Sequence, residues 1–232
     1  MTLLEFKQKN NIEFTNTALL EQAFIHRSYI NENPRTGLVH NERLEFLGDA
    51  VLELIVTKYL YEKYPHQNEG DLTAYRSALV NAVTLGDLAS ALCFNDMMKL
   101  SKGEAKDVHR ARSSILADAY EAFVGALYLD QDFDTVKEFV TNTLLIKTDE
   151  IIRKGLYKDA KSFVQEKSQE LYGITPNYKI LSEEGPDHDK LFLVGIYFGD
   201  EKIAEGSGKS KQEGETVAAR KALEVKGWVA KN

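Results

Sequence analysis

The sequence predicts a multidomain protein, with an all-α N-terminal domain followed by a smaller α+β domain. The chain of 232 residues is long enough for two domains of ordinary size. Residues 1–153 place apolar side chains at spacings of three and four, which is typical of packed helices. From residue 159 the pattern changes to a helix, three short strands and a second helix. We therefore expect domains at residues 1–153 and 159–228, joined by a linker at residues 154–158.

The N-terminal domain is expected to consist of helices. Helical periodicity covers four stretches, at residues 44–61, 71–93, 113–129 and 133–152. Short polar segments separate the earlier stretches from one another and from what precedes them, at residues 31–37, 65–70 and 101–108.

The C-terminal domain is expected to have the order α-β-β-β-α. Its first helix, at residues 159–172, should contact the core through Phe163, Val164 and Leu171. The other elements are strands at residues 178–181, 191–198 and 202–205, and a helix at residues 212–226. Glycine-containing turns lie between the strands. This order within about 70 residues indicates a compact α+β unit.

The chain is acidic overall, but its charge is unevenly distributed. Lysine and arginine number 29 against 36 aspartates and glutamates, and taken alone the net charge of −7 argues against a nucleic-acid-binding protein, which usually carries a basic excess. Residues 1–153 contain 23 acidic and 16 basic side chains, whereas residues 154–232 contain 13 of each. The acidic excess therefore belongs to the helical domain, and the C-terminal domain can still present lysines locally.

Neither a signal sequence nor a membrane-spanning segment is expected. The N-terminus lacks a basic start followed by an apolar run, and no stretch approaches ~18 uncharged apolar residues. Cys93 is the only cysteine, which excludes an intramolecular disulfide and fits a reducing compartment. We expect a cytoplasmic protein with no membrane partner.

Residues 41–52, NERLEFLGDAVL, are the most informative segment of the chain. On a helix with about 100° per residue, Glu42, Glu45 and Asp49 share one side. Gly48 is costly inside a helix unless another helix approaches closely. We expect a buried helix whose carboxylates border protein, because apolar residues cover its opposite side: Leu44, Leu47, Val51, Leu54 and Ile55.

A second acidic pair, Asp118 and Glu121, lies on a helix with small neighbours. The two residues are three apart and share a face, and the surrounding alanines allow another helix to approach. If this helix packs against residues 44–61, four carboxylates converge on a site suited to Mg²⁺ or Mn²⁺. Either acidic stretch alone is also explained as a solvated helix face, as Glu53 beside Asp49 illustrates.

These segments resemble bacterial ribonuclease III, the double-stranded-RNA endonuclease. Residues 42–49, ERLEFLGD, match the signature of that family without a departure. Further similar segments are HRSY at 26–29, EGD at 69–71, LVN at 79–81, and SILAD at 114–118 with Glu121. Residues 159–228 resemble the double-stranded-RNA-binding domain of the same family, so the resemblance covers nearly the whole chain.

The resemblance implies roles for the acidic residues and for one aromatic residue. Four carboxylates would hold the catalytic metal: Glu45, Asp49, Asp118 and Glu121. Asp49 and Glu121 would be the least replaceable of the four. Glu42 and Glu69 would support RNA positioning or a second metal. Phe46 would be the ball of a ball-and-socket contact between the subunits of a homodimer.

The implied activity is hydrolysis of phosphodiester bonds in double-stranded RNA by magnesium-activated water, with Mn²⁺ as a substitute ion. The implied products carry a 5′-phosphate and a 3′-hydroxyl, with a short 3′ overhang, because the two subunits would make paired cuts. Two metal ions would stabilise the attacking and the leaving oxygen together. The implied substrates are precursors of rRNA, mRNA and small RNA, and no small-molecule substrate is expected.

Three segments of the C-terminal domain resemble RNA contacts: Gln165 and Gln169, then His188, then Lys209 and Lys211. A-form RNA offers 2′-hydroxyls in its minor groove and phosphates along its major groove, so amide and cationic side chains suit it. Lys209 and Lys211 open the last helix, whose N-terminus favours phosphate. The sequence departs from the family at Gln212 and Gly214, where basic or helix-favouring residues are common.

Two other functions are consistent with parts of this pattern. A regulator that binds double-stranded RNA could use the helical domain only to dimerise, and a helical scaffold could bind proteins alone. A degenerate nuclease would be expected to lose at least one of the four metal-binding acids, and all four are present. A scaffold leaves the C-terminal domain unexplained. The sequence therefore favours the enzyme.

Overall fold

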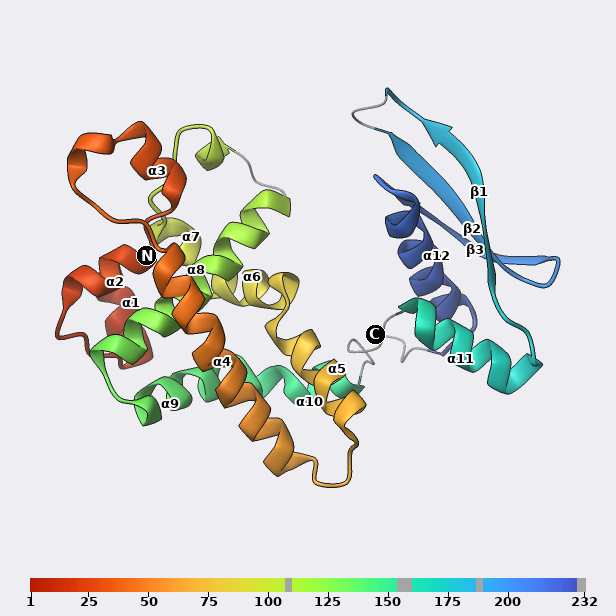
Figure 1. Ribbon diagram of the computed structural model, residues 1–232, viewed down its shortest axis with the longest axis horizontal. Helices are drawn as coiled ribbons and strands as arrows, with labels where there is room; N and C mark the ends of the chain where they lie inside the picture. The colour runs from red at the N-terminus through yellow and green to blue at the C-terminus, as the bar shows by residue number, and fades with distance from the viewer. Residues whose placement is uncertain (107–109, 154–159, 187–189, 229–232) are drawn as a thin grey trace. The chain divides into compact units, whose positions relative to one another are not determined.

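The computed structural model describes residues 1–106, 110–153, 160–186 and 190–228 (Figure 1). The chain forms two compact units, residues 1–151 and 152–232, and each is described by itself. The expected linker at residues 154–158 lies outside the described residues.

The described part of the first unit is helical. Three short 3₁₀ segments connect its helices, at Pro34–Thr36, Glu104–Lys106 and Leu145–Lys147. The α-helices are α1 (Leu3–Asn10), α2 (Thr17–Ala23), α3 (Arg27–Glu32), α4 (Glu42–Lys63), α5 (Glu69–Val80), α6 (Ala82–Ala91), α7 (Phe94–Met97), α8 (Arg110–Asp130), α9 (Phe133–Thr143) and α10 (Thr148–Arg153).

Helix α8 is the centre of this unit. It packs against α2, α4, α6, α7 and α9, and α4 crosses it along much of its length (Figure 1). Tyr120 and Phe123 of α8 are fully buried, and Phe123 meets the rings of Phe6, Phe24 and Phe94. Helix α8 is therefore enclosed on most sides, and its acidic residues Asp118 and Glu121 are half-buried.

The close approach of α4 to α8 confirms the expectation for Gly48. A Cβ added at Gly48 would collide with the backbone carbonyl of Glu121. Backbone cannot move aside as a flexible side chain can, so only glycine fits. The glycine therefore brings the acidic stretches of the two helices together.

Three expectations for the helices are wrong in detail. Residues 71–93 form two helices, because Asn81 accepts a hydrogen bond from the backbone N–H of Thr84 at 2.9 Å and starts α6. Residues 133–152 also break, because α9 ends at Thr143 before a 3₁₀ turn. Leu54, expected on the buried side of α4, is 58% exposed.

The second unit confirms the predicted order α-β-β-β-α. Its elements are α11 (Ala160–Tyr172), β1 (Asn177–Glu184), β2 (Leu191–Phe198), β3 (Glu201–Gly208) and α12 (Lys211–Val225). The strands form one antiparallel sheet in the order β1-β2-β3, with Ile196 of β2 opposite both Tyr178 and Ala204. Both helices contribute to one core with the sheet, where Val164, Ile196 and Ala218 are fully buried.

One expected core contact of α11 is wrong. Phe163 and Val164 pack into the core as expected, but Leu171 is 53% exposed. The neighbouring Tyr172 is 51% exposed, although its ring packs against Phe198 and Trp228. Among the described residues, no helix is long and apolar enough to span a membrane.

Candidate metal centre and RNA-binding surface

The start of α4 is held in place by the residue before it. Asn41 is buried, its side chain donates to the carbonyl of Ala23 at 3.1 Å, and its backbone N–H donates to Ile25 at 2.9 Å. These bonds fix the first turns of α4 against the segment that follows α2. The acids of α4 therefore have a defined position relative to the rest of the unit.

Three of the predicted metal-binding acids meet where α4 crosses α8. Carboxylate oxygens of Glu45, Asp118 and Glu121 all lie within 4.8 Å of one another, and all three side chains are half-buried. We call these residues the carboxylate trio. Asp49, the fourth predicted ligand, is exposed and lies outside the trio, but its charge acts on both Glu45 and Glu121.

Burial and mutual repulsion disfavour the ionised forms of the trio. Burial, followed by the charges of Asp118, Glu42 and Asp49, raises the pKa of Glu45 to about 7. Burial, followed by Asp49 and Asp118, raises the pKa of Glu121 to about 8. Burial also raises the pKa of Asp118, and His26 partly opposes this.

This arrangement fits a divalent cation. The neighbouring charges that act most strongly on Glu45 and Glu121 are all carboxylates, so no basic side chain among the described residues neutralises these two strongly. A half-buried, uncompensated carboxylate cluster is unfavourable unless a cation joins it. Small hard cations such as Mg²⁺ prefer carboxylate oxygens at about 2.0–2.1 Å, a distance that the spacing of the trio allows after small side-chain movements.

The two auxiliary acids are not part of the trio, although the charge of Glu42 acts on Glu45. Glu42 pairs with two basic residues, because Arg27 donates to one of its oxygens at 3.2 Å and the His40 ring lies 3.7 Å from the other. Glu69 is exposed at the start of α5. It lines a cavity of about 460 Å³ between α4 and α5, together with Thr57, Leu60, Tyr61, Gln67, Leu72, Thr73 and Arg76.

Two residues near the trio were not predicted to act there. Glu53 is half-buried, and its charge also raises the pKa of Glu121, so it is more than an exposed acid. Its position one helical turn after Asp49 was the available signal. Arg27 comes from another segment, and only its proximity in three dimensions reveals that it pairs with Glu42.

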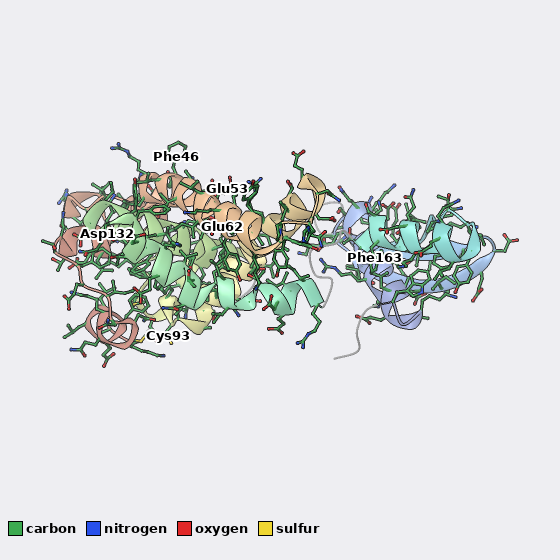
Figure 2. The ribbon with its side chains drawn as sticks, turned by 90° about the horizontal axis from the view of Figure 1, so that it is seen from below. Phe46, Glu53, Glu62, Cys93, Asp132 and Phe163 are labelled. Atoms are coloured by element: carbon green, nitrogen blue, oxygen red, sulfur yellow. The ribbon has the colours of Figure 1, made fainter. Side chains whose placement is uncertain are left out.

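Phe46 lies on the surface of the unit. Its ring is 81% exposed and projects from α4 (Figure 2). Leu54 and Tyr61, which lie within about 80° of Phe46 around the helix axis, are also exposed. Together these side chains form an apolar stripe along α4.

The predicted RNA contacts of the second unit that can be described are exposed. Gln165 and Gln169 lie on α11, and Gln169 accepts a hydrogen bond from Thr175 at 3.2 Å. Lys209 and Lys211 flank Ser210, which caps the N-terminus of α12. His188 lies outside the described residues.

The departure from the family at Gly214 has a packing reason. Gly214 is buried where α12 meets the sheet, and an added Cβ would lie 2.8 Å from Cγ2 of Val194. The glycine therefore allows α12 to approach β2 closely.

Both units match known families. A profile of the ribonuclease-III-like family matches residues 16–148, and one of the double-stranded RNA binding motif matches residues 160–226. Similar curated proteins include ribonuclease 3 of Borreliella afzelii, 45% identical over 223 residues, with 96% of this chain and 91% of the relative covered. Ribonuclease 3 of Geobacillus thermodenitrificans is 46% identical over 224 residues, with 95% and 89% covered.

Solved structures agree with these matches. A structure of the ribonuclease III nuclease domain from Campylobacter jejuni, described as flexible in a region involved in dimer formation, has a TM-score of 0.55 and 36% identity. It covers 60% of this chain and 94% of its own. A second structure of that domain has a TM-score of 0.56 and 35% identity, with 62% and 95% covered.

Proposed function

The chain belongs to the ribonuclease III family of endoribonucleases that act on double-stranded RNA, and from this premise we propose how its residues perform the reaction. The carboxylate trio, with Asp49 beside it, holds Mg²⁺, with Mn²⁺ as a substitute ion. The reaction is hydrolysis by an in-line water, leaving 5′-phosphate and 3′-hydroxyl ends. The convergence of Glu45, Asp118 and Glu121 carries this proposal.

Each part of the cluster has a distinct task. A bound magnesium ion supplies an activated water and stabilises negative charge on the phosphate oxygens. Glu45, Asp118 and Glu121 would hold the ion through their half-buried carboxylate oxygens. Asp49 is more exposed and faces the approaching RNA. Its charge beside Glu121 further favours a cation at this position.

We also propose that the protein acts as a homodimer. The exposed stripe of Phe46, Leu54 and Tyr61 lies on one side of α4, and the cavity between α4 and α5 opens near its far end. Two copies of α4 packed antiparallel around a two-fold axis near Leu54 would bring Phe46 of each subunit to the cavity of the other. Two sites related in this way would make paired cuts and leave a short 3′ overhang.

The second unit then supplies most of the duplex binding. We assign Gln165 and Gln169 to the minor groove and Lys209 and Lys211 to phosphates, with His188 as a further minor-groove contact. The neutral net charge of residues 154–232 is no obstacle, because phosphates are contacted locally. Recognition by shape is consistent with rRNA, mRNA and small-RNA precursors as substrates.

Substitution of Glu121 tests the metal centre. Glu121→Gln should lower the cleavage rate of a long RNA duplex by about 1,000-fold or more, because it removes a charged ligand from the trio while keeping its shape. The assay compares cleavage with and without Mg²⁺ and includes single-stranded RNA. Glu62→Gln, an exposed acid further along α4 (Figure 2), is the matched control. Wild-type cleavage by Glu121→Gln would refute the assignment.

A further inference from the structure

Arg27 pairs with Glu42, next to the carboxylate trio, and is mostly exposed. Its Nη1 donates to Oε1 of Glu42 at 3.2 Å, while 66% of its side chain remains accessible. A guanidinium group carries five N–H donors in a planar fork. The contact with Glu42 therefore holds one edge of the fork and leaves a large part of the group facing solvent.

The backbone around Arg27 is anchored from two sides. The N–H of Asn41 and the carbonyl of Ile25 join the preceding segment to the start of α4, at 2.9 Å. The N–H of His26 donates to the carbonyl of Lys99 at 3.1 Å, and the N–H of Ser101 donates to Oγ of Ser28 at 3.0 Å. Arg27 therefore starts from a fixed position, and Glu42 fixes the direction of its side chain.

The same turn lies beside the carboxylate trio. His26, the residue before Arg27, interacts electrostatically with both Asp118 and Glu42. Glu42 in turn acts on Glu45 of the trio. One carboxylate thus separates Arg27 from the residues that hold the metal in the proposed function.

We propose that Arg27 binds a backbone phosphate of the RNA next to the phosphate held at the carboxylate trio, and that Glu42 positions Arg27 for this contact. The inference rests on the proposed function, since it requires a duplex seated at the trio. Arginine suits this task, because its planar fork matches two phosphate oxygens. A cation at the rim also offsets the repulsion between the RNA and the acids of α4.

This assignment makes Glu42 a positioning residue. Its two carboxylate oxygens face Arg27 and His40, and Glu42 is not part of the trio whose oxygens lie within 4.8 Å of one another. The alternative is that the pair only holds α3 against α4. Exposed ion pairs contribute about 0–1 kcal/mol, so such a pair would matter little for RNA. The phosphate contact predicts that removing the Arg27 guanidinium weakens RNA binding, whereas a purely structural pair predicts no change in binding.

Duplex binding by the full-length protein distinguishes the two interpretations. All variants are made in the Glu121→Gln background, so that RNA remains intact, and binding is measured over a series of salt concentrations. Arg27→Ala should weaken binding about tenfold and reduce the slope of log K against log salt concentration by about 1. Arg27→Gln, which can still donate to Glu42, should show the same loss without loosening α3. Glu42→Gln keeps a side-chain oxygen that can accept from Arg27 and removes a negative charge near the RNA, so it should leave binding unchanged or tighten it.

Lys58→Ala is the matched control, because Lys58 is another exposed cation paired with a carboxylate, at 3.9 Å. It lies 16 residues beyond Glu42 on α4, about 24 Å along the helix, and should leave binding and slope unchanged. The unfolding temperature of each variant reports whether the packing of α3 against α4 is weakened.

The inference is overturned if Arg27→Gln binds with wild-type affinity and slope, or if Glu42→Gln weakens binding as much as Arg27→Gln does. Failure of the proposed function would be seen in a different measurement, because the Glu121→Gln protein would then still cleave the duplex.

Discussion

In the first unit α4 approaches α8 through Gly48, and in the second unit α12 approaches the sheet through Gly214. The two contacts differ in the charges placed around them. Glu45, Asp118 and Glu121 meet beside the first contact, and the strongest charges around Glu45 and Glu121 are other carboxylates. The lysines of the second unit form ordinary surface pairs, such as Lys202 with Glu205 at 2.9 Å.

This difference separates a reactive site from a binding surface. A helix pair that buries uncompensated carboxylates loses stability locally unless a cation binds, so its charge pattern indicates function. A domain whose charges are compensated can bind a polyanion only through local groups, such as the lysines at the start of α12. The net charge of −7 comes from residues 1–153 alone, since residues 154–232 are neutral overall.

The largest expected effect comes from the two glycines. Gly48→Ala should lower the free energy of unfolding of the first unit by about 3 kcal/mol, because the added methyl group meets the backbone of Glu121. Gly214→Ala should cost less, about 1 kcal/mol, because its added methyl group meets Cγ2 of Val194 at 2.8 Å instead of colliding with a backbone carbonyl, and because alanine favours the helix. Gly48→Ala should also abolish cleavage by separating the trio.

Urea unfolding measures the two units separately. Trp228 is the only tryptophan and packs on Phe198 in the second unit, so its fluorescence reports that unit. Far-UV circular dichroism is dominated by the helices of the first unit. Gly103→Ala is the control, since an added Cβ there meets only Oγ of Ser101 at 3.8 Å. Equal stabilities of Gly48→Ala and the wild type would contradict the packing argument.

The second effect is a pH dependence that the metal should remove. The pKa values of Glu45 and Glu121 rise from 4.5 to about 7 and about 8 in the folded protein, so the folded state holds protons that the unfolded state releases. The stability from these groups is fully present below about pH 4.5 and is lost as the pH rises through 7 and 8. Bound Mg²⁺ favours the ionised carboxylates and should abolish this loss.

Thermal unfolding between about pH 6 and about pH 9, in EDTA and in Mg²⁺, measures this effect. The transition seen by circular dichroism should move to lower temperature with pH only in EDTA. The second unit is the internal comparison. Lys202 lowers the pKa of Glu205, so the stability from this pair is lost only at acid pH and should not change over the range measured. Identical pH slopes in EDTA and Mg²⁺ would argue against a metal at the trio.

The sequence predicted the architecture well because the helices and strands of each unit have a regular spacing of apolar residues, which is visible locally. The apolar spacing of residues 44–61 and 113–129 matches α4 and α8, and the strand pattern after residue 177 matches the sheet. Helix ends were less predictable. The break at Asn81 depends on one hydrogen bond from the backbone N–H of Thr84 to the Asn81 side chain, and the helical spacing alone does not distinguish exposed Leu171 from buried Val164.

The sequence predicted which acidic residues belong to the site, but it did not predict how deeply each side chain is buried. Helical periodicity places Glu45 and Asp49 on one side of α4, but only packing against α8 decides that Glu45 joins the trio while Asp49 stays exposed. Contacts between distant segments, such as Arg27 with Glu42, have no local signal at all.

The smallest expected effect concerns the second unit alone. Lys211→Ala should weaken duplex binding about threefold to tenfold and lower the salt slope by about 1, because one phosphate contact is lost. The loss is limited because the Lys211 ammonium group lies 3.8 Å from Glu183. Binding a phosphate therefore means giving up part of this ion pair and of the hydration of Lys211. Filter binding in the Glu121→Gln background measures affinity without cleavage.

Lys202→Ala is the matched control for this last comparison, since Lys202 is also exposed and paired with one carboxylate but lies near the start of β3 instead of at a helix N-terminus. It should leave both affinity and salt slope unchanged. At saturating RNA in the active protein, Lys211→Ala should cut at the wild-type rate, because the trio is intact. If Lys202→Ala and Lys211→Ala weakened binding equally, the second unit would attract RNA by its overall charge, and the local helix N-terminus would have no special role.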